Sequence, residues 1–296
     1  MWDNASAISN EGIEFEAQYD VIRKKIWNWS VGFNLSHNKN MLRKTYNGED
    51  LNDKVLGRPV YGIYTFKDEG IVQKEEDIPM YLNASGKQIP LYFQSINNPL
   101  RVGGRKIKDQ NYDGVIDDKD LYYAGSTLPA VYGGLNSHLE WKGLSFDVLF
   151  SYTISRKVMN MYKNSAFTFT KDFGVIMNYF HAGDFWTTSN RDAKYPSLEF
   201  ADKDYVGQFD GNVDSNIENI SFLRLKQLVI GYQIPKNWLK GSFIKDANVY
   251  LSGENLFLLT NYSGVDPEII NPYSGKDDGT QYPLNRKVTL GLNLKF

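Results

Sequence analysis

The sequence contains no cysteine among its 296 residues. This absence excludes disulfide frameworks, cysteine-ligated zinc, iron–sulfur clusters and thiol nucleophiles, and it leaves both oxidising and reducing compartments open. An excess of basic charge is also missing, because 33 Lys and Arg face 35 Asp and Glu, which gives a net charge of −2. No positive field exists to hold nucleic acid, so nucleic acid is not an expected partner.

Long apolar runs are missing too. No stretch approaches the roughly 18 uninterrupted apolar residues of a membrane-spanning helix, so helical membrane proteins are excluded. A transmembrane β-barrel is not excluded, because its strands alternate apolar and polar residues and average out as hydrophilic. The first residues, Met1 to Ser6, lack the basic and apolar regions of a signal peptide. We therefore expect either a cytosolic protein or an internal piece of a longer one.

What the sequence does contain is an alternation of apolar and polar residues, which is typical of β-strands with one apolar face. This alternation predicts seven strands, and no apolar repeat of helical period persists over three turns. In the fifth strand the alternation slips between Leu225 and Leu228, where a β-bulge would restore it. The predicted strands cover residues 13–21, 27–36, 131–141, 144–152, 222–232, 247–253 and 288–296.

Short and long connections alternate between these strands. Short or moderate ones follow the first, third and fifth strands, and long ones rich in Gly, Asn, Asp and Tyr follow the second, fourth and sixth. Outer-membrane barrels have short periplasmic turns and long outer loops, so Phe296 is predicted at the periplasmic rim. Within the longest connection, Val60 to Phe66 and Ile89 to Phe93 could add a strand pair.

Strand length distinguishes a membrane barrel from a soluble sandwich, which also has one apolar face. The longer predicted strands run nine to eleven residues, enough to cross a hydrocarbon core of ~30 Å, whereas strands of soluble proteins average about 5–6. Aromatic residues near strand ends, such as Trp27, Trp141, Tyr152 and Phe296, would lie in interfacial girdles. The pattern thus favours an all-β, antiparallel transmembrane barrel.

Five segments and the chain ending carry a resemblance to a known family. They are residues 10–17 (NEGIEFEA), 57–71 (GRPVYGIYTFKDEGI), 109–118 (DQNYDGVIDD), 222–232 (FLRLKQLVIGY), 249–257 (VYLSGENLF) and 282–296 (YPLNRKVTLGLNLKF). In this order and spacing they resemble the C-terminal barrel of SusC/RagA-type TonB-dependent transporters. Members of this family are outer-membrane proteins of Bacteroidota that import glycans or oligopeptides.

The resemblance implies that residues 1–296 form about seven to nine strands of a 22-stranded barrel. The signal peptide, TonB box, plug domain and N-terminal strands of such a transporter are then expected outside this sequence. The resemblance also implies nutrient import across the outer membrane. The implied partners are a SusD-like surface lipoprotein, the TonB complex through the missing N-terminal region, and outer-membrane lipid. Phe296 would form part of an assembly signal.

A different class of protein also fits the pattern, namely a soluble calcium-binding all-β adhesin or carbohydrate-binding module. Partitioning would distinguish the two, because barrel strands fractionate with outer membrane or detergent. An enzyme is not expected. The three histidines (His37, His138 and His181) are far apart and lack a zinc-binding spacing, and the Ser-x-x-Lys match at Ser242 has no companion motifs.

The segment from Asp109 to Asp120 has the ligand spacing of a calcium loop. Side-chain oxygens fall at loop positions 1, 3, 5, 9 and 12, glycine falls at position 6, and a main-chain carbonyl falls at position 7. Asp120 is shorter than the usual Glu at position 12, and no helices are predicted beside the loop. An acidic turn stabilised by side-chain to backbone hydrogen bonds is the alternative. The predicted ligands are Asp109, Asn111, Asp113, Val115, Asp117 and Asp120.

The long connection from Ile154 to Asn219 is rich in aromatic residues. They could stack on sugar rings, or they could form a core that keeps the connection folded. The second interpretation is favoured, because aromatic burial serves folding before it serves ligands. The aromatic residues are Phe167, Phe169, Phe173, Tyr179, Phe180, Phe185 and Trp186.

Overall fold

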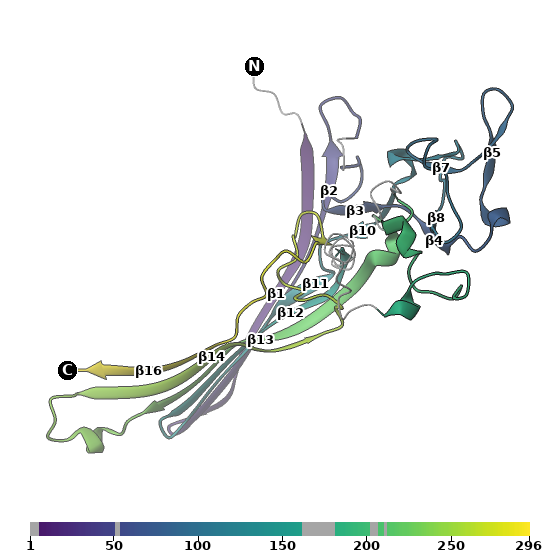
Figure 1. Ribbon diagram of the computed structural model, residues 1–296. Helices are drawn as coiled ribbons and strands as arrows, with labels where there is room; N and C mark the ends of the chain where they lie inside the picture. The colour runs from purple at the N-terminus through teal and green to yellow at the C-terminus, as the bar shows by residue number, and fades with distance from the viewer. Residues whose placement is uncertain (1–5, 51–53, 162–180, 202–206, 210–211) are drawn as a thin grey trace.

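A long antiparallel sheet dominates the molecule (Figure 1). The computed structural model describes residues 6–50, 54–161, 181–201, 207–209 and 212–296. Seven long strands lie side by side in chain order, and the short strand β15 (Lys276–Asp277) pairs in parallel with the end of β12. The long strands are β1 (Ala7–Lys24), β2 (Trp27–Lys44), β11 (Val131–Trp141), β12 (Leu144–Asn160), β13 (Ile217–Gln233), β14 (Asp246–Thr260) and β16 (Lys287–Lys295).

All seven strands predicted from the alternation are confirmed, and most are longer than predicted. The expected bulge is present, because the β13–β14 register shifts between Leu225 and Gln227. A tight turn connects β11 and β12 at Lys142 and Gly143, with φ values of 48° and 90°. A two-residue turn with positive φ at both central residues matches the right-handed twist of a hairpin. Glycine adopts positive φ without strain.

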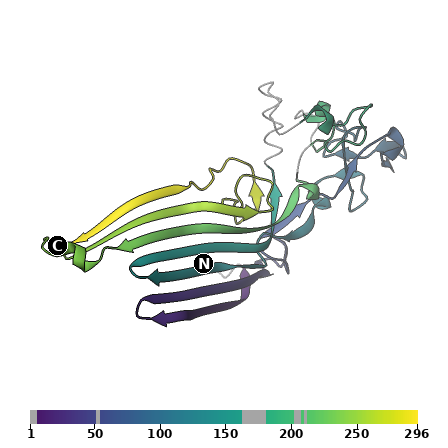
Figure 2. The same cartoon turned by 90° about the horizontal axis from the view of Figure 1, so that it is seen from below.

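Short and long connections leave the sheet at opposite ends, as predicted (Figure 2). Residues 25–26, 142–143 and 234–245 connect strands at one end, where the chain also ends. The long connections, residues 45–130, 161–216 and 261–286, leave from the other end. In the described part of the chain, helical structure is limited to short 3-10 turns, none of which is long and apolar enough to cross a membrane.

The first two long connections fold together into a separate unit, which we call the head (described residues of 61–127 and 181–216). It contains four small two-stranded sheets: β3 with β10, β4 with β8, β5 with β6, and β7 with β9. Their bounds are β3 (Gly62–Thr65), β4 (Asp68–Ile71), β5 (Met80–Leu82), β6 (Gln88–Pro90), β7 (Tyr92–Phe93), β8 (Arg105–Ile107), β9 (Val115–Ile116) and β10 (Tyr122–Ser126). The 3-10 turns among the described residues are η1 (Glu75–Asp77), η2 (Asp118–Asp120), η3 (Ala182–Asp184), η4 (Leu198–Ala201), η6 (Asp214–Asn216) and η7 (Lys236–Leu239).

The predicted pairing of Val60–Phe66 with Ile89–Phe93 is wrong. The first segment contributes β3, which pairs with β10, whereas the second is divided between β6 and β7. Neither segment adds a strand to the large sheet. The physical reason is that these apolar residues are buried in the core of the head, so their partners are set by three-dimensional packing and not by the main-sheet ladder.

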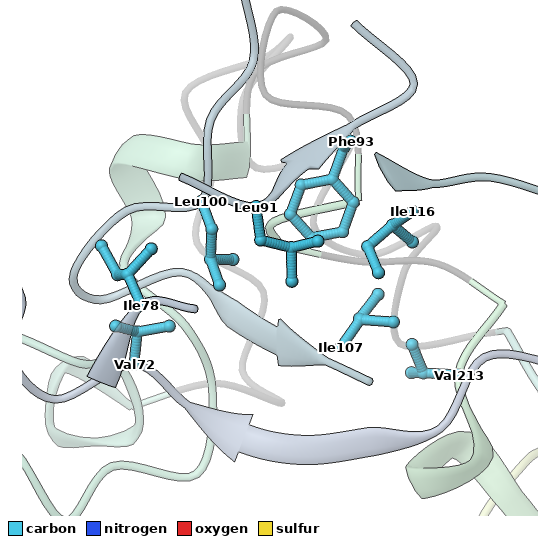
Figure 3. Packing of buried hydrophobic residues seen from close by; sticks show 8 residues of the cluster. All are labelled: Val72, Ile78, Leu91, Phe93, Leu100, Ile107, Ile116 and Val213. Atoms are coloured by element: carbon cyan, nitrogen blue, oxygen red, sulfur yellow. The ribbon is translucent and has the colours of Figure 1, made fainter. Parts of the chain in front are cut away.

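Eight buried aliphatic and aromatic residues form the main core of the head (Figure 3). Seven of them come from the first long connection and Val213 from the second, so the two connections share one core. A second core contains Phe185, Tyr195, Phe200 and Phe209, which confirms that the second connection has its own aromatic core. Residues Phe167, Phe169, Phe173, Tyr179 and Phe180 lie outside the described residues.

Buried polar side chains hold the two connections together. Arg105 of β8 forms an ion pair with Asp68 of β4 and donates to the main-chain oxygen of Phe209 (Nη2···O 3.1 Å). The buried Gln208 amide donates to Asn98 Oδ1 (2.8 Å) and accepts from the Arg101 amide (3.0 Å). Buried polar groups with complete partners specify one packing arrangement, because any other arrangement leaves them unpaired.

Asp214 in η6 joins three parts of the head. Its carboxylate accepts hydrogen bonds from Lys67 Nζ (2.6 Å), the Asp68 amide (2.9 Å) and the Tyr122 hydroxyl (2.7 Å). Burial would raise the pKa of Asp214, but the hydrogen bonds from Lys67, Asp68 and Tyr122 outweigh it and hold this pKa below its ordinary value. Burial, together with Asp214, raises the pKa of Tyr122 to about 12.

Replacing Asp214 by Asn is expected to destabilise the head at neutral pH by about 1–3 kcal/mol, because charge-assisted hydrogen bonds are lost. A depressed carboxylate pKa contributes stability above the unfolded-state value of 3.8 and loses it as the pH falls through the folded-state pKa. The difference between the native protein and Asp214→Asn should therefore shrink below that pH. Amide hydrogen exchange in β3, β4 and β10 at neutral and acid pH measures this difference in stability. Glu76→Gln, at an exposed residue, is the control. A difference that persists at low pH would contradict this assignment.

Candidate functional site

The register of the sheet places apolar residues from every long strand on one face. One row runs across β1 to β14 in directly paired positions: Ala17, Phe33, Leu135, Phe150, Leu225 and Phe257. Many side chains of this face are exposed, including Phe15 at 55% and Leu290 at 75%. Within the described residues no second layer covers this face, as a second sheet would in a soluble sandwich.

An aromatic ring fills the gap that Gly133 leaves on this face. A Cβ atom at Gly133 would lie 2.1 Å from the main-chain oxygen of Asn34 and 2.7 Å from the Tyr152 hydroxyl. The Tyr152 ring lies across this position and stacks on Phe33, with centroids 6.2 Å apart and planes 2° apart. The glycine is therefore required for close approach, and the ring restores the apolar surface above it.

The opposite face is polar. Its corresponding row contains Glu16, Asn34, Gly134, Ser151 and Arg224. Nearer the short turns, His138 Nδ1 contacts Asp147 Oδ1 of the next strand, and Asn28 Nδ2 donates to Glu140 Oε2 (3.4 Å). A wall with one apolar and one polar face is what a barrel needs when it separates lipid from a water-filled interior.

The apolar face has a defined height. On β2 it extends from Trp27 to Leu35, and beyond Leu35 the same face carries His37 and Lys39. On β1 the partner of Lys39 is Glu11, which accepts from Arg43 (3.5 Å). These nine residues are eight steps of ~3.3 Å apart and cover roughly 26 Å along the strand, and their number matches the ~9–11 residues that a tilted strand needs to cross a membrane.

The predicted girdle residues lie at both ends of this band. Trp27 and Trp141 are direct partners beside the short turns, and both are about half exposed. Tyr152 lies toward the head end. Phe296 follows the last strand, is 63% exposed, and stacks on Phe243 at 5.6 Å. Sequence analysis missed Phe243, because it lies in an irregular connection without alternation.

The third long connection, loop 261–286, is attached to the polar face of the sheet. Arg224 of β13 is buried and donates to Asp266 Oδ1 (2.6 Å), and it also pairs with Glu268. Lys226, the bulged residue, contacts Glu268 as well (2.8 Å). The bulge therefore brings two basic side chains onto one carboxylate and fixes the loop over the polar face.

A second buried arginine holds the same loop through main-chain oxygens. Arg156 of β12 donates to Thr127 (3.0 Å), Pro267 (3.5 Å) and Ile270 (3.4 Å). Sequence analysis missed the roles of Arg156 and Arg224. Arg224 stood out as an arginine within a predicted strand, whereas Arg156 lies beyond the predicted strand 144–152, and nothing in the sequence identifies the distant partners of either residue.

The predicted calcium loop is closed by hydrogen bonds to the backbone. The buried Asp109 carboxylate accepts from the amides of Tyr112 (2.7 Å) and Gly114 (2.9 Å). The buried Asp120 carboxylate accepts from the amides of Gln110 (2.8 Å) and Asp117 (2.9 Å). Burial raises the pKa of Asp120 despite these hydrogen bonds. Beside Asp109, burial and the Asp109 carboxylate raise the pKa of Tyr81 to about 12.

The remaining predicted ligands have similar partners. Asp113 accepts from the Val115 amide (3.0 Å), Asn111 accepts from the Asp113 amide (3.0 Å), and Asp117 caps η2 through the Lys119 amide (2.8 Å). These bonds are the ones that the acidic-turn interpretation expects. No group of three or more His, Cys, Asp or Glu side chains in the described part of the chain is arranged to hold a metal ion. Calcium binding stays a prediction.

The fold and the two faces define the class of the protein, which is part of the wall of an antiparallel β-barrel. No family model matches the chain. It is 30% identical over 306 residues to TonB-dependent receptor P26 of Formosa agariphila, covering 99% of this chain and 30% of that protein. It is 26% identical to TonB-dependent receptor SusC of Bacteroides thetaiotaomicron, covering 100% of this chain and 27% of that protein.

Solved structures give the same fold. A structure of the RagAB peptide transporter has a TM-score of 0.68 at 22% identity, covering 99% of this chain and 30% of that chain. The RagAB peptide importer in its open-open state has a TM-score of 0.67 at 24% identity, covering 98% and 29%. The resemblance to SusC/RagA-type TonB-dependent receptors is therefore confirmed along the whole chain. The chain spans about three tenths of the length of these relatives, which are receptors and transporters and not enzymes.

If the acidic loop binds calcium, calorimetric titration should give a dissociation constant of about 10⁻⁴–10⁻³ M, the range of extracellular modules. Asp113→Ala should abolish the calcium-dependent heat, because its exposed side chain is a predicted ligand. Asp118→Ala removes a neighbouring carboxylate that is not a predicted ligand and should leave the heat unchanged. Absence of calcium-dependent heat in the native protein would establish the segment as an acidic turn.

Proposed function

We propose that this chain is the C-terminal part of the barrel of an outer-membrane TonB-dependent importer. The observation that carries the proposal is the uncovered apolar face, which is in register across all seven long strands. In the described sheet, β1 and β16 each have a long-strand neighbour on one side only. Unpaired strand edges are not viable in lipid, so further strands must pair with both to close the barrel.

In this proposal the polar face lines the passage through which a nutrient enters. The head and loop 261–286 lie on the outer side, and the short turns with Phe296 lie on the periplasmic side. TonB would supply the energy through the N-terminal region of the complete importer. The substrate would be a glycan or an oligopeptide, as the resemblance to the SusC/RagA family implies.

The proposed partner is a SusD-like surface lipoprotein, seated on the head. Support comes from the RagAB structures, which match this chain in fold. The alternative function, a soluble calcium-binding adhesin or carbohydrate-binding module, is not favoured. A soluble sandwich would bury the apolar face under a second sheet, and the described residues outside the large sheet form the head and the loops instead.

Cysteine labelling tests the orientation of the two faces. The chain has no native cysteine, so each substitution introduces one thiol into this part of the protein. In the complete outer-membrane protein, Phe33→Cys should react several-fold more slowly with a water-soluble maleimide than Asn34→Cys, because lipid shields the apolar face. Leu251→Cys and Ser252→Cys form a second pair in β14, and Tyr282→Cys, at a residue 87% exposed, is the positive control. The reverse order of rates would overturn the proposal.

Deleting Phe296 is expected to lower the outer-membrane level of the complete protein several-fold. The reason is that the terminal aromatic ring follows an alternating strand and stays exposed, as an assembly signal requires. Immunoblotting of membrane fractions measures the level. Phe243→Ala removes the stacking partner and keeps the terminal residue, so it controls for lost packing. Equal loss in both variants, or no loss on deletion, would reject the assembly role.

A further inference from the structure

Seven exposed lysines gather at the end of the sheet where the short connections lie. Six of them lie in the three short connections or directly beside them, and the seventh is the last residue of β16. The chain as a whole carries a net charge of −2, so this basic charge is a local feature of one end. We call the set the basic rim: Lys24, Lys25, Lys142, Lys236, Lys240, Lys245 and Lys295.

The basic rim is continuous, because the short connections lie beside one another along this end of the sheet (Figure 2). The Lys142 amide donates to the Ile26 oxygen of the first connection (3.2 Å). The Gln233 amide, directly before the third connection, donates to the Gly143 oxygen (2.7 Å). The last residue of that connection donates to the Lys295 oxygen (2.7 Å), so the backbone joins the third connection to the final strand as well.

The charge of the basic rim is not neutralised within the described part of the chain. None of its lysines forms an ion pair there. The nearby acidic residues already have other partners: Asp20 pairs with Arg23 (2.9 Å), Glu140 accepts from a side chain of β2 (3.4 Å), and Asp246 accepts from Gln233 (2.5 Å). The ammonium groups are therefore available to an anionic partner outside this part of the protein.

Aromatic rings lie beside these lysines at the edge of the apolar band. The Lys142 ammonium lies 5.3 Å from the ring centroid of Trp141. Phe243 is 77% exposed and stacks on Phe296, which continues the apolar row of β16, and Trp238 in η7 is 73% exposed. Aromatic rings at headgroup level, with lysines that extend beyond them into water, are typical of a membrane interface. The combination favours a lipid surface over an acidic protein as the partner.

We propose that the basic rim binds the phosphate groups of anionic phospholipids in the leaflet that the short turns reach. This inference rests on the proposed barrel and names the lipid class that it selects. Clusters of lysine beside a membrane-spanning segment attract anionic lipid, whereas a zwitterionic headgroup carries a positive charge of its own that the lysines repel. Such binding would fix the depth of this edge of the barrel in the membrane.

Electron paramagnetic resonance tests the proposal on the complete protein, reconstituted in phosphatidylcholine vesicles. Trace amounts of spin-labelled phosphatidylglycerol and spin-labelled phosphatidylcholine are compared, and the measured quantity is the fraction of each label that the protein surface immobilises. The anionic label should be immobilised preferentially at about 0.01 M salt. The preference should fall at about 1 M salt, because the Debye length shrinks from roughly 30 Å to about 3 Å.

A variant with four rim lysines replaced by Gln should lower this preference at least about twofold at equal protein-to-lipid ratio. Replacing the same four by Arg keeps the charge and should keep the preference. A matched control replaces four exposed lysines of the head by Gln and should leave the preference unchanged. The rim positions are Lys25, Lys236, Lys240 and Lys245, and the head positions are Lys74, Lys87, Lys119 and Lys194.

Three outcomes would each overturn the proposal: equal immobilisation of both labels by the native protein, a preference that persists in the rim Gln variant, or an equal decrease in the rim and head variants. The same spectra separate this result from the proposed function. A protein that immobilises both labels equally still contacts lipid, so only the selectivity of the basic rim would be refuted. A protein that immobilises neither label would refute the membrane barrel as well.

Discussion

The register of the antiparallel ladder is the constraint on which the rest of the structure depends. Each long strand alternates apolar and polar residues, so a slip of one position would place polar side chains on the apolar face. The observed pairing keeps Phe33, Leu135 and Phe150 in one row, and the bulge at Lys226 restores the row where the sequence slips. Backbone pairing and a continuous apolar face are thereby satisfied together.

The same register determines what the connections do. Since the strands alternate in direction, all three long connections leave from one end, where the apolar band gives way to charged residues such as Lys39 and Glu11. There they can bury a core of their own, and Val213 of the second connection completes the core of the first. Loop 261–286 instead returns over the polar face and is held by Arg224 and Arg156.

The sheet and the connections have distinct physical roles. The sheet has one apolar and one polar face, and in the proposed barrel it needs neighbours on both edges. The head carries an ordered polar network and stays outside the apolar band. A cleft lined by Tyr61, Asn212 and Tyr273 exists only because all three long connections meet, so no single connection forms it.

Local pattern was enough to determine the strands, the two faces, the bulge near Lys226 and the end of the sheet at which Phe296 lies. The strands, the faces and the bulge depend on neighbours two residues apart, and the position of Phe296 depends on the order of short and long connections, both of which the sequence shows directly. Tertiary structure alone decided the pairing of β3 with β10, the ion pair of Arg224 with Asp266, and the partners of Asn212. Such contacts join residues far apart in the chain, and alternation carries no information about which distant side chains meet when a core closes.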